Sequence, residues 1–146
     1  NNYGQLGVGN TTTYSSPVQV GALTTWDEIA WSGPNGSLYA LKTDGTLWSW
    51  GRNNYGQLGV GNTTDYSSPV QVGGLTTWAD ISAGNGFAMG TTTGGTLYGW
   101  GQNGNGNLGQ GNTTNYSSPV QVGALTTWSQ TLPKLYGSSH FLAIKG

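Results

Sequence analysis

The chain has 146 residues, no cysteine, a formal net charge of −1 and only 6 % charged residues, against about 25 % in an ordinary soluble domain. These values exclude a disulfide framework and a thiolate zinc site, and four Lys and Arg against five Asp and Glu argue against the basic surface that nucleic-acid binding requires. Seven tryptophans and eight tyrosines favour a folded, turn-rich β protein over a disordered chain.

A repeat of about 50 residues organises the sequence. The phrase NNYGQLGVGNTT starts at Asn1 and again at Asn53, and a looser copy, NGNGNLGQGNTT, starts at Asn103. Each copy leads to a tryptophan, and these recur at spacings of 52 and 50 residues: Trp26, Trp78 and Trp128. Because the period is long and no 3.6-residue apolar pattern appears, we predict an all-β propeller of four-stranded blades. We treat residues 1–146 as one partial propeller with repeats 1–52, 53–102 and 103–146.

Four short strands are expected in the first repeat, in chain order. Alternating, β-branched or aromatic residues mark them at Pro17–Val20, Trp26–Trp31, Ser37–Lys42 and Thr46–Trp50. Clusters of Gly and Asn separate them, as turns require. The sequence TDGT, which precedes the last strand, predicts a tight hairpin turn centred on Asp44 and Gly45.

The segment from Leu38 to Val72 resembles the repeat of the regulator-of-chromosome-condensation family. The matching positions are Ala40-Leu41, Asp44-Gly45, Trp50-Gly51, Asn53, Gly56-Gln57-Leu58-Gly59, Pro69 and Val72. The next repeat matches less completely, because Asn107 replaces the Gln. The histidine that often precedes the Ala-Leu strand in the family is present as His140, whereas Ser37 and Phe87 replace it elsewhere. The resemblance implies a β-propeller, usually of seven blades, of which about three are present here.

In this family the NNYGQLG phrase connects one blade to the next. Strands of the TLWSW type occur at Thr46–Trp50 and Thr96–Trp100, and none precedes Asn1 or follows Gly146. The last repeat therefore lacks its final strand, and a ring made of two copies would lack this strand at each junction. We expect a fragment of a longer polypeptide rather than a self-completing dimer. Either the remainder of the same propeller or a neighbouring chain would complete the open blade.

Three features that suggest chemistry have simpler structural interpretations. The sequence GNGNLG, at Gly104, Gly106 and Gly109, matches a dinucleotide fingerprint, but a turn and a strand follow it instead of the required helix. Asp27 and Glu28 would point to opposite faces of a strand and could not act as a pair. His140 is the only histidine, and a structural hydrogen bond accounts for it better than a triad or a metal site. We predict no catalytic residue, no cofactor and no metal.

Tyrosines recur in the repeat connections together with neutral amide and hydroxyl groups. Aromatic faces beside such groups suit sugars or protein surfaces, and repetition of one site would give avidity. An alternative is that these tyrosines pack one blade on the next. The candidate recognition residues are Tyr3, Tyr14, Tyr55, Tyr66 and Tyr116. The NTT sequences at 10–12, 62–64 and 112–114 allow glycosylation in a secreted eukaryotic protein, or serve as turn chemistry.

These features predict a non-enzymatic scaffold for protein or glycan recognition, with no nucleic-acid partner and no membrane span. We expect a structural or receptor-binding part of a virion appendage or a bacterial surface protein, hence an extracellular or virion-surface location. The near-identical copies and the almost uncharged, Thr-, Asn- and Gly-rich sequence motivate this expectation. One alternative is an intracellular adaptor or exchange factor for a small GTPase. Another is a proteinaceous inhibitor of an enzyme.

Overall fold

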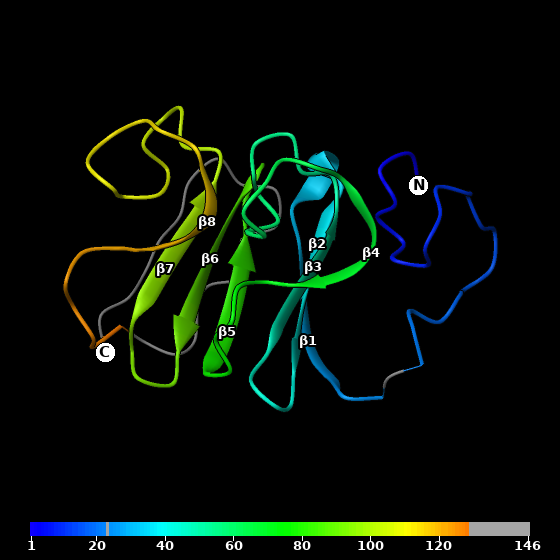
Figure 1. Ribbon diagram of the computed structural model, residues 1–146, viewed down its shortest axis with the longest axis horizontal. Coiled ribbons are helices and arrows are strands. Elements are labelled where there is room, and N and C mark those ends of the chain that lie inside the picture. Colours follow the sequence, from blue (N-terminus) through cyan, green and yellow to red (C-terminus); the bar gives the residue numbers. More distant parts are fainter. Residues whose placement is uncertain (23, 129–146) are drawn as a thin grey trace.

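A computed structural model describes residues 1–22 and 24–128 of the chain. Its strands form two separate four-stranded antiparallel sheets, here called blade A and blade B, which stand side by side (Figure 1). This arrangement confirms the predicted all-β class and the four-stranded blade. His140 and most of the expected third blade lie outside the described residues.

Each blade is a meander whose strands pair in sequence order. Blade A consists of β1 (Trp26–Trp31), β2 (Ser37–Lys42), β3 (Leu47–Gly51) and β4 (Tyr66–Gln71), with a short 3-10 turn η1 (Gly33–Asn35) between β1 and β2. Blade B consists of β5 (Trp78–Ala83), β6 (Phe87–Thr92), β7 (Leu97–Gly101) and β8 (Tyr116–Gln121). The outer strands β4 and β8 come from the repeat that follows their own sheet, so each blade takes one strand from across the repeat boundary, as predicted.

The expected strand at Pro17–Val20 is wrong. The hexapeptide YSSPVQ forms β4 at Tyr66–Gln71 and β8 at Tyr116–Gln121, whereas the same letters at 14–19 form no strand. The reason is pairing, because β4 forms a ladder with β3, and β8 with β7. Residues 14–19 have no such strand beside them in the part of the chain that the structure describes. The sequence favours an extended backbone, but a neighbouring strand must supply the hydrogen bonds.

The main core lies between the two blades. Alternate side chains of a strand point to opposite faces of its sheet. One face of blade A, its downstream face, contributes Ala30, Tyr39, Leu41, Leu47 and Val72 to this core. The upstream face of blade B contributes Trp78, Ile81, Ala83, Ala88 and Trp100. Strand β5 contacts both β1 and β2, so the blades are packed face to face in the manner of neighbouring propeller blades.

The NNYGQLG loops fasten each blade to its neighbour. In the loop after β3, Gly61 N donates to Ser117 O of β8 at 2.8 Å. A Cβ atom placed on Gly56, whose φ is +76°, would lie 2.5 Å from Ser117 Cα, so only glycine permits this approach. The same loop accepts a hydrogen bond from Tyr39, whose hydroxyl donates to Gln57 O at 2.7 Å. Burial raises the pKa of the Tyr39 phenol far above its ordinary value, so it remains a neutral donor.

Candidate recognition surface

One asparagine organises each repeat loop from inside. Asn53 is fully buried, and its Nδ2 donates to the backbone oxygens of Asn62 and Thr64 at 2.9 Å each. Its Oδ1 accepts from Leu58 N at 2.9 Å. Asn1 makes the equivalent three bonds in the first loop, and Asn103 retains two of them in the third. The three loops therefore have a common internal frame that fixes where their tyrosines lie.

Three of the five candidate tyrosines are held by this frame. The Nδ2 atom of Asn62 donates to the Tyr66 hydroxyl at 3.1 Å, and its Oδ1 accepts from Thr64 N at 2.9 Å. The corresponding hydroxyl contacts join Asn10 to Tyr14 at 3.1 Å and Asn112 to Tyr116 at 2.9 Å. The asparagine of each NTT sequence is thus bonded at both side-chain atoms within its own loop. This geometry favours the turn interpretation of these sequences.

The other two tyrosines lie at the edges of the blades. Tyr3 Cδ2 lies 3.5 Å from where a Cβ would stand on Gly36, in the turn between β1 and β2. Tyr55 Cδ2 lies 3.4 Å from the equivalent position on Gly86, between β5 and β6. These rings cover the first hairpin turn of the blade that follows their loop. The structure therefore divides the five tyrosines into a loop-bound set and a blade-junction set.

Polar side chains connect the two blade junctions into a continuous strip. The Arg52 guanidinium carbon stands 4.8 Å from the centroid of the Tyr3 ring, and Arg52 Nη1 donates to Asn35 Oδ1 at 3.5 Å. Asn35 Nδ2 donates in turn to Asn85 Oδ1 of blade B. Gln102 Oε1 approaches the Cβ position of Gly86 to 2.8 Å, beside Tyr55. We call this set the loop-face strip: Tyr3, Asn35, Arg52, Tyr55, Asn85 and Gln102.

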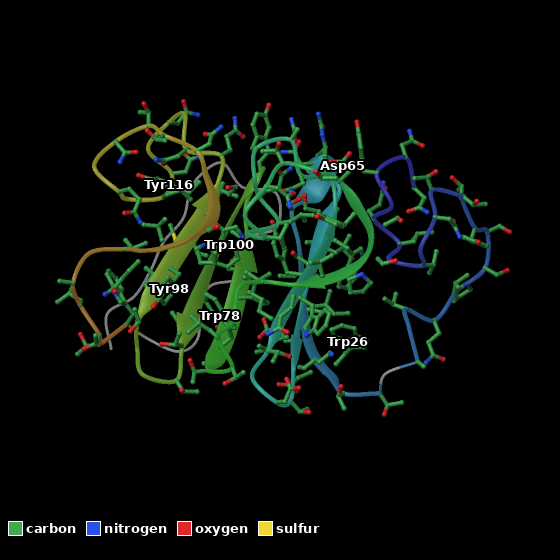
Figure 2. All side chains as sticks on the ribbon, viewed as in Figure 1. Trp26, Asp65, Trp78, Tyr98, Trp100 and Tyr116 are labelled. Atoms are coloured by element: carbon green, nitrogen blue, oxygen red, sulfur yellow. The ribbon has the colours of Figure 1, made fainter. Side chains whose placement is uncertain are left out.

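The strip lies at the end of the blades where the repeat loops begin, because Asn35 and Asn85 lie in the first turn of each blade, and Arg52 and Gln102 directly follow β3 and β7. Asp65, at the end of the second loop, marks this end in Figure 2. Its members are half-buried or exposed, so their polar ends can contact a partner. Sequence reasoning identified Tyr3 and Tyr55 but missed the amides and Arg52. The signal that could have found two of them is the Asn-Gly dipeptide, which recurs 50 residues apart at Asn35 and Asn85.

The opposite end of the blades has a different, charged character. A cleft of about 340 Å³ between the blades is lined by Asp27, Lys42 and Asp44, among others. Lys42 Nζ lies 3.9 Å from the Trp48 ring centroid, which is a cation–π contact. The hydroxyl and backbone N–H of Thr46 donate to Asp44 Oδ1 at 2.6 and 3.0 Å. These bonds, with a smaller contribution from Lys42, hold the pKa of Asp44 below its usual 3.8, so this carboxyl is an anion and not a proton donor at neutral pH.

The remaining sequence candidates that the structure describes are not assembled into a reactive site. Asp27 occupies a bulge in the β1–β2 ladder and is exposed, whereas Glu28 is aligned with Leu41 and half-buried. Gly104, Gly106 and Gly109 lie in the loop that leads to β8, so the segment after them is a strand and not a helix. Within residues 1–22 and 24–128 no three His, Asp or Glu side chains gather as metal ligands. No helix in the same residues is long and apolar enough to cross a membrane.

Comparison with known proteins identifies the repeat. The profile of the regulator of chromosome condensation (RCC1) repeat matches residues 44–90 and 94–133, and a second RCC1 repeat profile matches residues 78–107. The chain belongs to the RCC1 repeat family. Each full match begins near the β2–β3 or β6–β7 turn, so the family repeat and the structural blade are offset along the sequence.

Among curated RCC1-like proteins, the chain is 44 % identical over 70 residues to the ultraviolet-B receptor UVR8 of Arabidopsis thaliana, a match covering 48 % of this chain and 16 % of that protein. It is 46 % identical over 46 residues to human Protein RCC2, covering 32 % and 9 %. It is 40 % identical over 74 residues to the X-linked retinitis pigmentosa GTPase regulator of the dog, covering 49 % and 7 %. The match thus spans less than a fifth of each relative.

Two solved structures show the same fold at low sequence identity. Human WBSCR16 superposes with a TM-score of 0.68 at 21 % identity, over 83 % of this chain and 33 % of that one. Prp20p of Saccharomyces cerevisiae gives a TM-score of 0.64 at 18 % identity, over 75 % and 28 %. The two blades are therefore part of an RCC1-type propeller, as the sequence resemblance implied.

Proposed function

We propose that the chain is a non-catalytic recognition segment of an RCC1-type propeller, and that it binds a protein partner through the loop-face strip. The observation that carries this proposal is the strip itself. It places Arg52, Tyr3 and Tyr55 with three amides across both blades on one end of the molecule. Tyrosine and arginine dominate the binding energy of protein interfaces, and the amides supply neutral donors and acceptors.

Relatives support a role in recognition. UVR8 is named as a receptor, and the Prp20p structure is described together with its binding to Gsp1p and histones. Those properties belong to proteins of which this chain covers 16 % and 28 %. They motivate the choice of a protein partner over a glycan.

A binding panel tests the proposal. The chain is immobilised and exposed to core histones, to small GTPases in both nucleotide states, and to a glycan array. We expect one protein class to bind, and Arg52→Gln to weaken it by about tenfold, as loss of an interface arginine typically does. Thr43→Ala, at the opposite end of blade A and exposed, is the matched control and should leave binding unchanged. Binding of glycans alone, or equal losses in both variants, would contradict the proposal.

For the setting of the chain, we propose an extracellular or virion-surface protein with a structural or receptor-binding role. The nearly uncharged sequence supports this proposal, as do the almost identical segments 1–26 and 53–78, which differ only at Thr13/Asp65 and Ala22/Gly74. The name of the GTPase regulator supports the competing view of an intracellular adaptor or exchange factor. The full reading frame around this segment would distinguish the two settings. Flanking tail-fibre or secretion sequences would fit only the extracellular or virion-surface protein, and a flanking signalling domain would fit only the intracellular protein.

A further inference from the structure

The upstream face of blade A is an exposed counterpart of a face that is buried in blade B. Ile29 is 60 % exposed, whereas Ile81, in the same place on blade B, is 0 % exposed. Trp31 is 48 % exposed, whereas its counterpart Ala83 is 3 % exposed. A groove of about 350 Å³ lies over this face, between it and residues 5–20. Figure 1 shows this N-terminal segment beside blade A, on the side away from blade B.

The N-terminal segment contains the sequence of an outer strand. Residues 14–19 repeat the YSSPVQ sequence of β4 and β8, and the first loop is already fastened to blade A. Gly9 N donates to Ser67 O at 2.8 Å, and Trp50 Nε1 donates to Gln5 O at 2.9 Å. The first of these contacts recurs between the second loop and blade B, where Gly61 N donates to Ser117 O at 2.8 Å, whereas Trp100 Nε1 has no hydrogen-bond partner among the described residues. The segment thus stands where the outer strand of a preceding blade would stand.

The upstream face of blade A is bulkier than that of blade B. The β1–β2 register aligns Trp31 with Leu38, where the β5–β6 register aligns Ala83 with Ala88. The next aligned pairs are Ile29 with Ala40 and Ile81 with Gly90. Blade A therefore presents Trp for Ala, Leu for Ala and Ala for Gly. A sheet that fits tightly against blade B would overpack against blade A.

At the two central positions of their second strands, the downstream faces of the blades differ in the opposite sense. Blade A presents Ala30, Tyr39 and Leu41, and Tyr39 reaches across to Trp100 with ring centroids 6.4 Å apart. The ladder positions of blade B hold Ser82, Met89 and Thr91 instead. Thr91 is smaller than its counterpart Leu41, Ser82 is close in size to its counterpart Ala30, and methionine is adaptable where tyrosine is rigid. A downstream face of the blade B type leaves room for large residues opposite it.

We propose that the upstream face of blade A docks a repeat blade of the blade B type, with small or flexible residues at the positions of Ser82, Met89 and Thr91, and with residues 14–19 as its outer strand. The occupant is inferred from continuity with the interface between blades A and B. That interface shows which positions of a downstream face meet which positions of an upstream face. The size differences between the faces of blades A and B then show which kind of blade fits against blade A. Trp31 is the residue that selects it.

Two N-terminal extensions test this pairing. A copy of residues 78–102 fused before Asn1 supplies a blade B type, and a copy of residues 26–52 supplies a blade A type. Both reproduce natural junctions, because Asn103 and Asn53 follow these segments in the chain. The chain has no cysteine, so Ile29→Cys provides a single thiol whose rate of alkylation reports burial of this face. Thr63→Cys, in an exposed loop position, is the control that neither extension should protect.

We expect the blade B extension to slow alkylation at position 29 by about tenfold or more, as burial in a stable interface does, and the blade A extension to slow it much less. In the protein that carries the blade A extension, Trp31→Ala in the original chain, not in the copy, should restore protection of position 29 from alkylation. The substitution removes the bulk that would lie opposite Tyr39 of the copy. Equal protection by both extensions, or by neither, would overturn the proposal. So would protection in the unextended chain that increases with concentration, since a second copy would then be the occupant.

Discussion

Replacing Gly56 with alanine separates the blade-to-blade contact from local backbone strain. Gly56 has φ +76°, and a Cβ there would lie 2.5 Å from Ser117 Cα, 2.7 Å from its Cβ and 3.0 Å from its N. Carbon atoms in contact prefer about 3.5–4.0 Å, so the loop and β8 must move apart by about 1 Å. Gly61 in the same loop has φ +83° and would meet only Ser118 Oγ, at 3.7 Å, which makes Gly61→Ala the matched control.

Both variants incur the cost of a left-handed alanine, about 1–2 kcal/mol. Only Gly56→Ala adds overpacking against a backbone, about 1–3 kcal/mol, so we expect a total loss of about 2–5 kcal/mol against about 1–2 kcal/mol for Gly61→Ala. Urea unfolding followed by tryptophan fluorescence measures both, because Trp100 is fully buried beside this loop. If the two variants lose equal stability, the loop does not fasten blade A to blade B in the way that the contacts indicate.

Three further predictions concern hydrogen bonds of the loops and turns. Asn53→Ala removes three hydrogen bonds from the loop interior and should destabilise the chain by about 2–4 kcal/mol in the same assay. A loss of stability smaller than that of Gly61→Ala would show that Asn53 does not hold the loop together. Asp65 accepts from Asn53 N at 2.7 Å, as Asn115 does from its own loop, so Asp65→Asn should be nearly neutral and Asp65→Ala should cost about 1 kcal/mol. The pKa of Asp44 is held below 3.8 by Thr46, so its stabilising effect should be complete above that pH and be lost as pH falls through the lower folded value. An NMR titration should show this midpoint, and Thr46→Val should raise it.

The contrast between Trp26 and Trp78 shows that an equivalent position in the repeat does not specify whether a side chain is buried. Both tryptophans begin the first strand of a blade at the same place in the repeat, yet Trp78 is 3 % exposed and Trp26 is only half-buried, next to the N-terminal segment (Figure 2). Burial depends on the sheet that stands opposite, and that sheet comes from another repeat. The candidate tyrosines were open to the same ambiguity. The sequence proposed all five as one set, but only the packing separated Tyr3 and Tyr55 at the blade junctions from those bonded inside their loops.

The loop-face strip could be anticipated only in part. Arg52 and Gln102 follow Gly51 and Gly101 at the same place in successive repeats, but nothing in the sequence brings Arg52 to Tyr3, 49 positions earlier in the chain. The link from Asn35 to Asn85 likewise depends on how far the two blades are rotated about their interface. Such contacts between repeats are set by the stacking of whole sheets.

Local order followed from the sequence by itself. Strands β1, β2 and β3 and the turn at Asp44 depend on contacts between strands that follow one another in the chain, where side-chain alternation and glycine conformation decide the backbone. Tertiary structure alone decided whether YSSPVQ is a strand, because a strand takes its hydrogen bonds from a neighbour. It also decided which apolar face is core and which is open, because a sheet has two faces and only the next blade determines which of them is kept from water.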